Sequence, residues 1–237
     1  MWWPFAPRQI SEDVYQLRAP GCKVTAILEK DAVVLIDAGG RFSAGPVEAG
    51  LRSLGRSLRD VRLIALTHYH PDHTGGLAGL VAASGAEVAS HSTEAGFLCG
   101  DQPPPSPFRV AAVSAALRPV LPFTYGACVP VQHRLNDGDV LPGPTEVQVV
   151  HSPGHTAGSV CYYLPASKSV IVGDALQHRF RRLSPPAWLV TRDVDEARRS
   201  IGKLASLDID TVLFGHFSAI VSDGSGALRR LASRWAG

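Results

Sequence analysis

The chain has 237 residues, of which 45% are hydrophobic, and a formal net charge of +2. This composition is ample for a buried core, and we expect a single domain over residues 1–237. The charge is too small, and the lysines and arginines are too dispersed, to indicate a surface that binds nucleic acid. The chain has no apolar run near the ~18 residues of a membrane span and no signal-peptide pattern at its start. We therefore expect a cytoplasmic protein.

The first half of the chain predicts a sheet with helices. Short alternating or β-branched runs at 14–17, 24–29 and 32–36 indicate antiparallel strands. A helix is predicted over 46–58, because apolar residues recur there at helical spacing. Residues 61–66 are apolar nearly throughout, which is typical of a strand that is buried on both faces. A second helix over 74–83 and a strand over 86–90 follow.

A proline-rich segment separates the two halves. Seven prolines between residues 100 and 130 forbid long regular elements, although 110–117 could hold one short helix. Because the segment keeps apolar side chains such as Phe108 and Phe123 for packing, we expect a structured insertion that acts as a lid or binding loop.

The second half repeats the order of the first. Strands are predicted at 132–135, 146–150, 159–164, 169–172 and 211–214. Asp193 and Glu196 fit a capping box at the start of a helix, and a last helix is predicted over 226–235. This order indicates an α/β fold of two similar halves that pack sheet against sheet, with the helices outside.

A dense histidine motif follows the apolar run 61–66. The run Thr67-His68-Tyr69-His70-Pro71-Asp72-His73 places three imidazoles and one carboxylate within six positions. Alternate residues in extended backbone, such as His68 and His70, can point the same way. Imidazole nitrogens and ionised oxygens are ligands for transition metals, so the motif predicts a metal site with room for a second ion.

Three later segments repeat the pattern of an apolar run, a glycine and then a side chain that can bind metals. They lead to His155, Asp174 and His216. Each of the three alone would be an ordinary turn residue after a strand. Their order and their number make them candidate ligands.

Together these motifs resemble those of the metallo-β-lactamase-fold hydrolase superfamily, in its hydroxyacylglutathione hydrolase and lactonase-like branch. The resemblance covers about residues 14–220 and rests on the histidine motif, residues 151–156, Gly173-Asp174 and Gly215-His216. It implies a four-layer αββα sandwich in which two mixed β-sheets pack face to face with helices outside. It also implies seven ligands: His68, His70 and His155 for one metal, Asp72, His73 and His216 for a second, and Asp174 as a bridge.

The resemblance implies an enzyme in which a hydroxide, activated by two metals, attacks a small carbonyl substrate such as a lactone, thioester or other ester. Two divalent cations, two aspartates and the hydroxide leave a net charge of about +1, which stabilises an oxyanion. Asp72 is the candidate catalytic residue, because it would orient the hydroxide or transfer a proton. Since the ligands are nitrogen and oxygen only, we expect two zinc ions, with iron or manganese as alternatives.

Other functions share parts of this ligand set. Related persulfide dioxygenases hold one iron with two histidines and an aspartate, and tRNA-processing relatives hydrolyse phosphodiesters. True β-lactamases lack the bridging aspartate, so we expect that the protein is not one of them. The chain ends 21 residues after His216, which we expect to leave no room for a helical domain that binds glutathione.

Some residues near the motifs have a structural interpretation beside a functional one. Asp72 could cap the helix that follows it. His151 is expected to make a supporting hydrogen bond, and His91 and His133 are expected at the surface or at strand ends. Tyr69 is expected to pack away from the ligands.

The sequence leaves the partners of the chain open. His178 and Arg179 begin a basic stretch after Asp174, which is either a solvated loop or a contact for an anionic substrate. Trp2 and Trp3 would suit a sheet edge or the interface of a homodimer. The four cysteines have no metal-site spacing, so we expect buried, reduced thiols.

Overall fold

The computed structural model describes residues 6–235, which form two compact units. The first unit contains residues 6–90, 94–104 and 120–134, and the second contains residues 91–93, 105–119 and 135–235. Trp2 and Trp3, for which we predicted a role at a sheet edge or an interface, lie outside the described residues. Within 6–235, no helix is both long enough and apolar enough to cross a membrane.

The first unit is built on a seven-stranded sheet. Its strands, which neighbour one another in chain order, are β1 (Arg8–Gln9), β2 (Val14–Leu17), β3 (Val24–Leu28), β4 (Val33–Ile36), β5 (Val61–Ala65), β6 (Glu87–His91) and β7 (His133–Leu135). Strands β1 to β4 pair antiparallel, and β4, β5 and β6 pair parallel. Each parallel step needs a crossover, which α1 (Ala44–Ser53) and then α3 (Leu77–Ser84) supply.

The central strands of this sheet are buried on both faces, as the apolar run 61–66 predicted. All four residues of β4 and the last three of β5 are buried. Val47 and Leu51 of α1 and Leu80 of α3 pack with these strands in one hydrophobic cluster. Removing this apolar surface from water is the main stabilising term for the unit.

Two helices of the first unit differ from their predicted ranges. The helix predicted over 46–58 ends at Ser53, because Gly55 adopts a left-handed angle (φ 72°) and a capping box of Ser57 and Asp60 starts a separate 3-10 turn. The helix predicted over 74–83 is divided into α2 (Pro71–Thr74) and α3. The unit also contains α4 (Ala95–Cys99), which the sequence did not predict.

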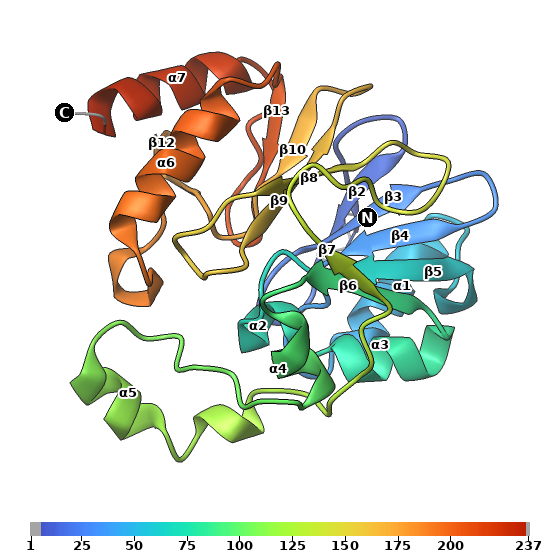
Figure 1. Ribbon diagram of the computed structural model, residues 1–237. Coiled ribbons are helices and arrows are strands. Elements are labelled where there is room, and N and C mark those ends of the chain that lie inside the picture. The colour runs from blue at the N-terminus through green and yellow to red at the C-terminus, as the bar shows by residue number, and fades with distance from the viewer. Residues whose placement is uncertain (1–5, 236–237) are drawn as a thin grey trace. The chain divides into compact units, whose positions relative to one another are not determined.

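The second unit has a four-stranded sheet and two long helices. The strand order is β13 (Thr211–Leu213), β10 (Ser169–Ile171), β9 (Val160–Leu164) and β8 (Gln148–His151), with only β10 and β13 parallel. Helices α6 (Val194–Ala205) and α7 (Gly224–Trp235) lie side by side (Figure 1), and Ile201, Leu204 and Leu228 join the strands in one core. Both sheets are mixed and carry helices, so the predicted α/β class is confirmed.

A two-stranded hairpin follows Asp174 where one alternative was a solvated loop. It consists of β11 (Gln177–Arg179) and β12 (Arg182–Ser184). Phe180 and Arg181 form the turn, with φ angles of 49° and 61°. Such angles suit the twist of a two-residue hairpin, but they are unfavourable for residues other than glycine, asparagine and aspartate.

The proline-rich segment 100–130 is divided between the units. It holds the predicted short helix, α5 (Ala111–Leu117), which has no buried residue. Phe108 is half-buried, but Phe123 is 71% exposed, so the expected packing role is wrong for Phe123. The function of the segment as a lid or binding loop stays a prediction.

The four cysteines are free, as their spacing predicted. Cys22 and Cys161 are buried, whereas Cys99 is half-buried and Cys128 is exposed. The expectation of buried thiols is therefore wrong for Cys128, which lies in the proline-rich segment, where the chain runs at the surface.

Gly154, directly before His155, provides a test of packing in the second unit. Its φ is 132°, and a Cβ atom at this position would overlap the backbone of Ala197 in α6. We predict that Gly154→Ala lowers the free energy of unfolding by about 1–3 kcal/mol, because both the backbone angle and the contact become unfavourable. Denaturant unfolding followed by circular dichroism measures the change.

The matched control is Gly202→Ala in α6, where an added Cβ atom meets nothing within 4 Å. That variant should gain about 0.4–1 kcal/mol, because alanine restricts the unfolded chain. Equal stabilities of the two variants would contradict the close packing of Gly154 against α6.

Candidate metal centre

The histidine motif of the first unit forms a buried cluster after β5. His68, His70 and His73 are 2%, 5% and 0% exposed. The ring centroids lie 4.7 Å apart for His68 and His70 and 4.2 Å apart for His68 and His73. Imidazoles this close and this buried cannot all carry a charge, because like charges repel strongly away from water. In its neutral form, each imidazole of the cluster has one nitrogen lone pair to offer a metal ion.

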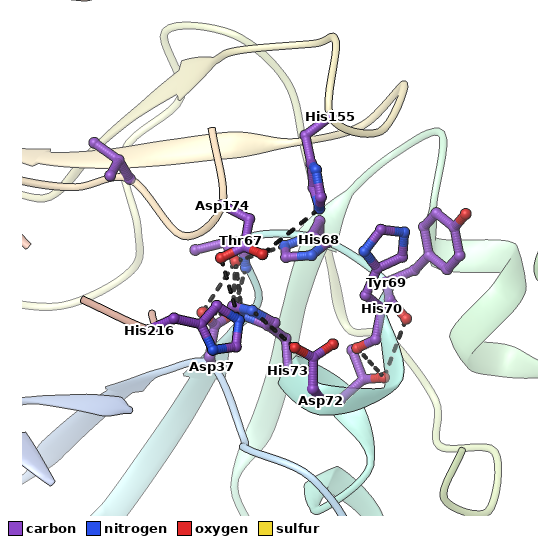
Figure 2. Close-up of polar contacts among 12 residues, drawn as sticks. Asp37, Thr67, His68, Tyr69, His70, Asp72, His73, His155, Asp174 and His216 are labelled. Carbon is purple, nitrogen blue, oxygen red and sulfur yellow. Dashed lines mark hydrogen bonds and ion pairs between the residues drawn. The ribbon is translucent and has the colours of Figure 1, made fainter. Parts of the chain in front are cut away.

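The carboxylate of Asp37 orders this cluster. Asp37 follows β4 with a left-handed backbone (φ 66°), and its side chain is 3% exposed. Its Oδ1 accepts a hydrogen bond from the backbone N–H of Thr67 at 2.8 Å, and its Oδ2 lies 2.8 Å from Nδ1 of His73 (Figure 2). The Thr67 hydroxyl lies 2.9 and 3.0 Å from the two carboxylate oxygens and 3.1 Å from Nδ1 of His68.

From this network we infer which ring nitrogens carry protons. An ionised carboxylate only accepts, so Nδ1 of His73 donates to Asp37 and its Nε2 keeps a lone pair. The Thr67 hydroxyl donates to Asp37 and accepts from Nδ1 of His68, which leaves Nε2 of His68 in the same state. Carboxylates that orient histidines in this way commonly support metal ligands. The first unit therefore fits a metal ion.

Asp72 lies beside His73 at a distance that suits a shared ion. One carboxylate oxygen is 3.8 Å from Nε2 of His73, which is too long for a hydrogen bond. Two ligands on one tetrahedral zinc, with bonds of about 2.0–2.1 Å, lie about 3.3 Å apart. The N-cap of α2 is His70 and Asp72 is inside the helix, so the capping interpretation of Asp72 is wrong.

In the second unit, three turns that are far apart in sequence supply candidate ligands. His155, Asp174 and His216 follow β8, β10 and β13, respectively. Nε2 of His155 lies 3.9 Å from one oxygen of Asp174, and Nε2 of His216 lies 3.4 Å from the other (Figure 2). Each oxygen of this carboxylate thus faces a different imidazole, at a spacing near that of ligands on a common ion.

The seven predicted ligands form two sets. The structure brings together His68, His70, Asp72 and His73 in the first unit, and His155, Asp174 and His216 in the second. Joint binding of two metals by both sets stays a prediction.

Sequence reasoning missed three residues of the first unit. Asp37 follows an apolar strand, as the candidate ligands do, so this sequence pattern could have identified it. The only indication for Thr67 was its position next to His68. Tyr125 gave no signal in the proline-rich segment, yet burial raises its pKa, as do Tyr69 and Asp72, and its hydroxyl has no hydrogen-bond partner among residues 6–235. Tyr69 packs against Phe97 with ring centroids 5.1 Å apart, which confirms a packing role. Its ring also lies edge-on to that of His70, with centroids 4.8 Å apart, so the expectation that it packs away from the ligands is wrong.

The predicted substrate contacts His178 and Arg179 both belong to β11. Nδ1 of His178 donates to the carbonyl oxygen of Ser218 at 2.8 Å. The guanidinium of Arg179 lies over the ring of Phe217, 5.9 Å from its centroid. Their role in substrate binding stays a prediction.

The remaining histidines have structural roles. His133 is partly exposed and lies 2.7 Å from the carboxylate of Glu87. Nε2 of His151 donates to the carbonyl of Ala157 at 3.0 Å, which confirms the expected supporting hydrogen bond. The rings of His151 and His91 stack with centroids 4.1 Å apart. His91 ends β6 as expected, but it is buried, and this burial, with His151 beside it, lowers its pKa to about 4.

Comparison with known proteins relates this arrangement to one family. The model of the metallo-beta-lactamase superfamily matches residues 18–216. The probable metallo-hydrolase YflN of Bacillus subtilis (strain 168) is 31% identical over 204 residues, which are 79% of this chain and 76% of YflN. The acyl-coenzyme A thioesterase MBLAC2 of Gallus gallus is 32% identical over 215 residues, 78% of this chain and 71% of that protein. The solved metallo-beta-lactamase family protein TTHA1429 of Thermus thermophilus has a TM-score of 0.71 at 25% identity, covering 95% of this chain and 79% of its own.

We predict that Asp37→Asn weakens zinc binding about 10- to 100-fold. The carboxylate of Asp37 has two acceptor oxygens for the donors of Thr67 and His73, whereas the amide of asparagine has only one. Asparagine still tolerates the left-handed backbone at this position. Competition with a chromophoric chelator measures the affinity. Asp60→Asn is the control, because Asp60 caps the turn at Ser57. Equal zinc affinity in the two variants would contradict this role of Asp37.

We also predict that His91 reduces stability as the pH falls from about 6.5 toward 4. Its folded-state pKa of about 4 lies below the ordinary 6.5, so the unfolded chain binds the proton first. The contribution of neutral His91 to the free energy of unfolding is complete above pH 6.5 and is lost as the pH approaches 4. His91→Asn keeps an acceptor for the N–H of Thr93, which lies 3.3 Å from Nδ1, and removes the titration. Denaturant midpoints at pH 7 and 4.5 should differ more in the wild type than in the variant; parallel changes would refute the prediction.

Proposed function

We propose that this chain, which belongs to the metallo-β-lactamase superfamily and is a metal-dependent hydrolase, uses two divalent metal ions to hydrolyse a small carbonyl substrate. A lactone, a thioester or another ester is the expected substrate. The observation that carries this proposal is the carboxylate of Asp174, whose two oxygens face different histidines. A carboxylate in that arrangement suits two ions side by side.

In this proposal each metal has three ligands of its own and shares Asp174. The first would be held by His68, His70 and His155, and the second by Asp72, His73 and His216. The hydrogen bonds of Asp37 and Thr67 support the assignment, because they leave Nε2 of His73 and of His68 with a lone pair. Nitrogen and oxygen donors favour zinc, with iron and manganese as alternatives.

The protein groups have different roles in the proposed hydrolysis. Bound ions would lower the pKa of a water molecule to about 7 and polarise the substrate carbonyl. Asp72, whose side chain is 40% exposed, is proposed to orient the attacking water and to carry a proton to the leaving group. Asp37 would hold His73 in one tautomer throughout.

The experiment that tests this function begins with metal quantification on untreated protein. Lactones, thioesters, phosphodiesters and β-lactams are then assayed with and without a chelator. Two zinc ions per chain and chelator-sensitive hydrolysis of a lactone or thioester are expected. One iron per chain with oxygen consumption would instead indicate a dioxygenase, and preferential cleavage of phosphodiesters or β-lactams would overturn the substrate class.

We predict that Asp174→Ala reduces bound metal and lowers kcat/KM by about 100-fold or more, since even residues that only support ligands contribute 10- to 100-fold. The circular dichroism spectrum should remain that of the wild type. Asp208→Ala is the control, because Asp208 is 70% exposed and its carboxylate pairs with Lys168 at the surface of the same unit. Wild-type turnover in Asp174→Ala would show that the carboxylate is no ligand.

A further inference from the structure

A cavity of about 630 Å³ lies in the second unit, and every residue that lines it belongs to that unit. The β11–β12 hairpin, the segment after β13 and the helix α7 line it. Sites for small organic molecules have volumes of about 300–1,000 Å³, so the cavity is large enough for such a ligand.

The cavity concentrates positive charge. Arg181, Arg182, Arg230 and Arg234 line it together with one carboxylate, that of Asp223, which gives a net charge of +3 with neutral histidine. The whole chain has a net charge of only +2. Asp223 pairs with Arg230 at 2.8 Å, whereas the other three arginines form no ion pair with any residue in the described range 6–235. Their charges are available to a ligand.

Two of the segments that line the cavity directly follow candidate ligands in the chain. β11 begins three residues after Asp174, and Ile220 of the wall lies four residues after His216. The hydrogen bond from His178 to Ser218 joins these two segments, and the His178 ring stacks on Phe214 with centroids 5.7 Å apart. The cavity is therefore tied to the part of the second unit that contains Asp174 and His216.

We propose that this cavity binds the phosphate end of a phosphorylated acyl thioester, such as an acyl-coenzyme A, whose thioester reaches the metal ligands of the same unit. The inference rests on the proposed hydrolase function. Guanidinium groups bind phosphate through paired N–H donors, and a ligand with several phosphates matches several arginines. Leu183, Ile220 and Val221 add apolar surface for the organic part of the ligand.

The reaction needs water alone as co-reactant. The oxygen of water forms the new C–O bond and the C–S bond breaks. The sulfur leaves as a thiol with one proton of the water, and the acyl group becomes a carboxylic acid. Because the phosphates take no part in this step, they can be held at a distance from the carbonyl.

The test measures binding of coenzyme A to chelator-treated protein by isothermal titration calorimetry, with pantetheine, which has no phosphate, as the matched ligand. Coenzyme A should bind at least about tenfold more tightly than pantetheine, and its affinity should fall as salt is added. This readout does not depend on hydrolysis. Binding of coenzyme A without turnover of any ester would refute only the proposed function, and hydrolysis of acyl-pantetheine without binding of coenzyme A would refute only this inference.

Three variants locate the binding site. The double variant Arg182→Gln/Arg234→Gln should lose about tenfold or more in affinity for coenzyme A. Arg229→Gln, the neighbour of Arg230 on α7 that does not line the cavity, should bind like the wild type. Asp223→Asn should bind about two- to fivefold more tightly, because it removes the cavity's carboxylate while asparagine keeps the left-handed angle (φ 56°) and the cap on the N–H of Gly226.

The gain in Asp223→Asn is the discriminating result, because a purely structural role for the ion pair with Arg230 predicts a loss or no change. Equal losses in the double variant and in Arg229→Gln would overturn the proposal. Tight binding of a short RNA that the double variant abolishes, without binding of coenzyme A, would also overturn it and would assign the cavity to nucleic acid.

Discussion

The buried hydrogen bonds of Asp37 are the constraint on which the chemistry of the first unit depends. An ionised carboxylate that is 3% exposed is costly unless its oxygens are paired, and here the donors of Thr67 and His73 pair them. The sheet makes this pairing available. β4 and β5 are parallel neighbours, so both end at the same edge, and the N–H of Asp37 bonds the carbonyl of Ala65 at 2.8 Å. The carboxylate thus meets the histidine motif wherever the two strands are correctly aligned.

Strand direction also explains the candidate ligands of the second unit. β10 is parallel to β13, and β8 and β10 are both antiparallel to β9. The carboxyl ends of β8, β10 and β13 therefore lie at one edge of the sheet, and His155, Asp174 and His216 follow these three ends.

The features that could be predicted from the sequence are those that depend on local residue patterns. The ligands were visible because apolar strands end in short, chemically distinctive turns, and β2 and α5 were predicted within one residue of their observed ends. The end of α1 depended on the backbone angle of Gly55, which composition alone does not reveal. The partners of Asp37 and the cationic cavity were beyond prediction for a different reason. They join side chains from segments 30 or more residues apart, which only the folded sheets and the packing of α7 bring together.

The two sets of metal-binding side chains differ in chain separation. His68, His70, Asp72 and His73 lie within six consecutive positions, so β5 and the first turn of α2 already bring them close together. His155 and His216 are separated by 61 residues, and closing a loop of that length costs conformational entropy that only the completed sheet and its core repay. The spacing of the four side chains in the first unit is therefore set largely by local structure, whereas the three of the second unit meet only when its sheet is formed. Partial unfolding of the second unit would scatter its three side chains while those of the histidine motif stayed close together.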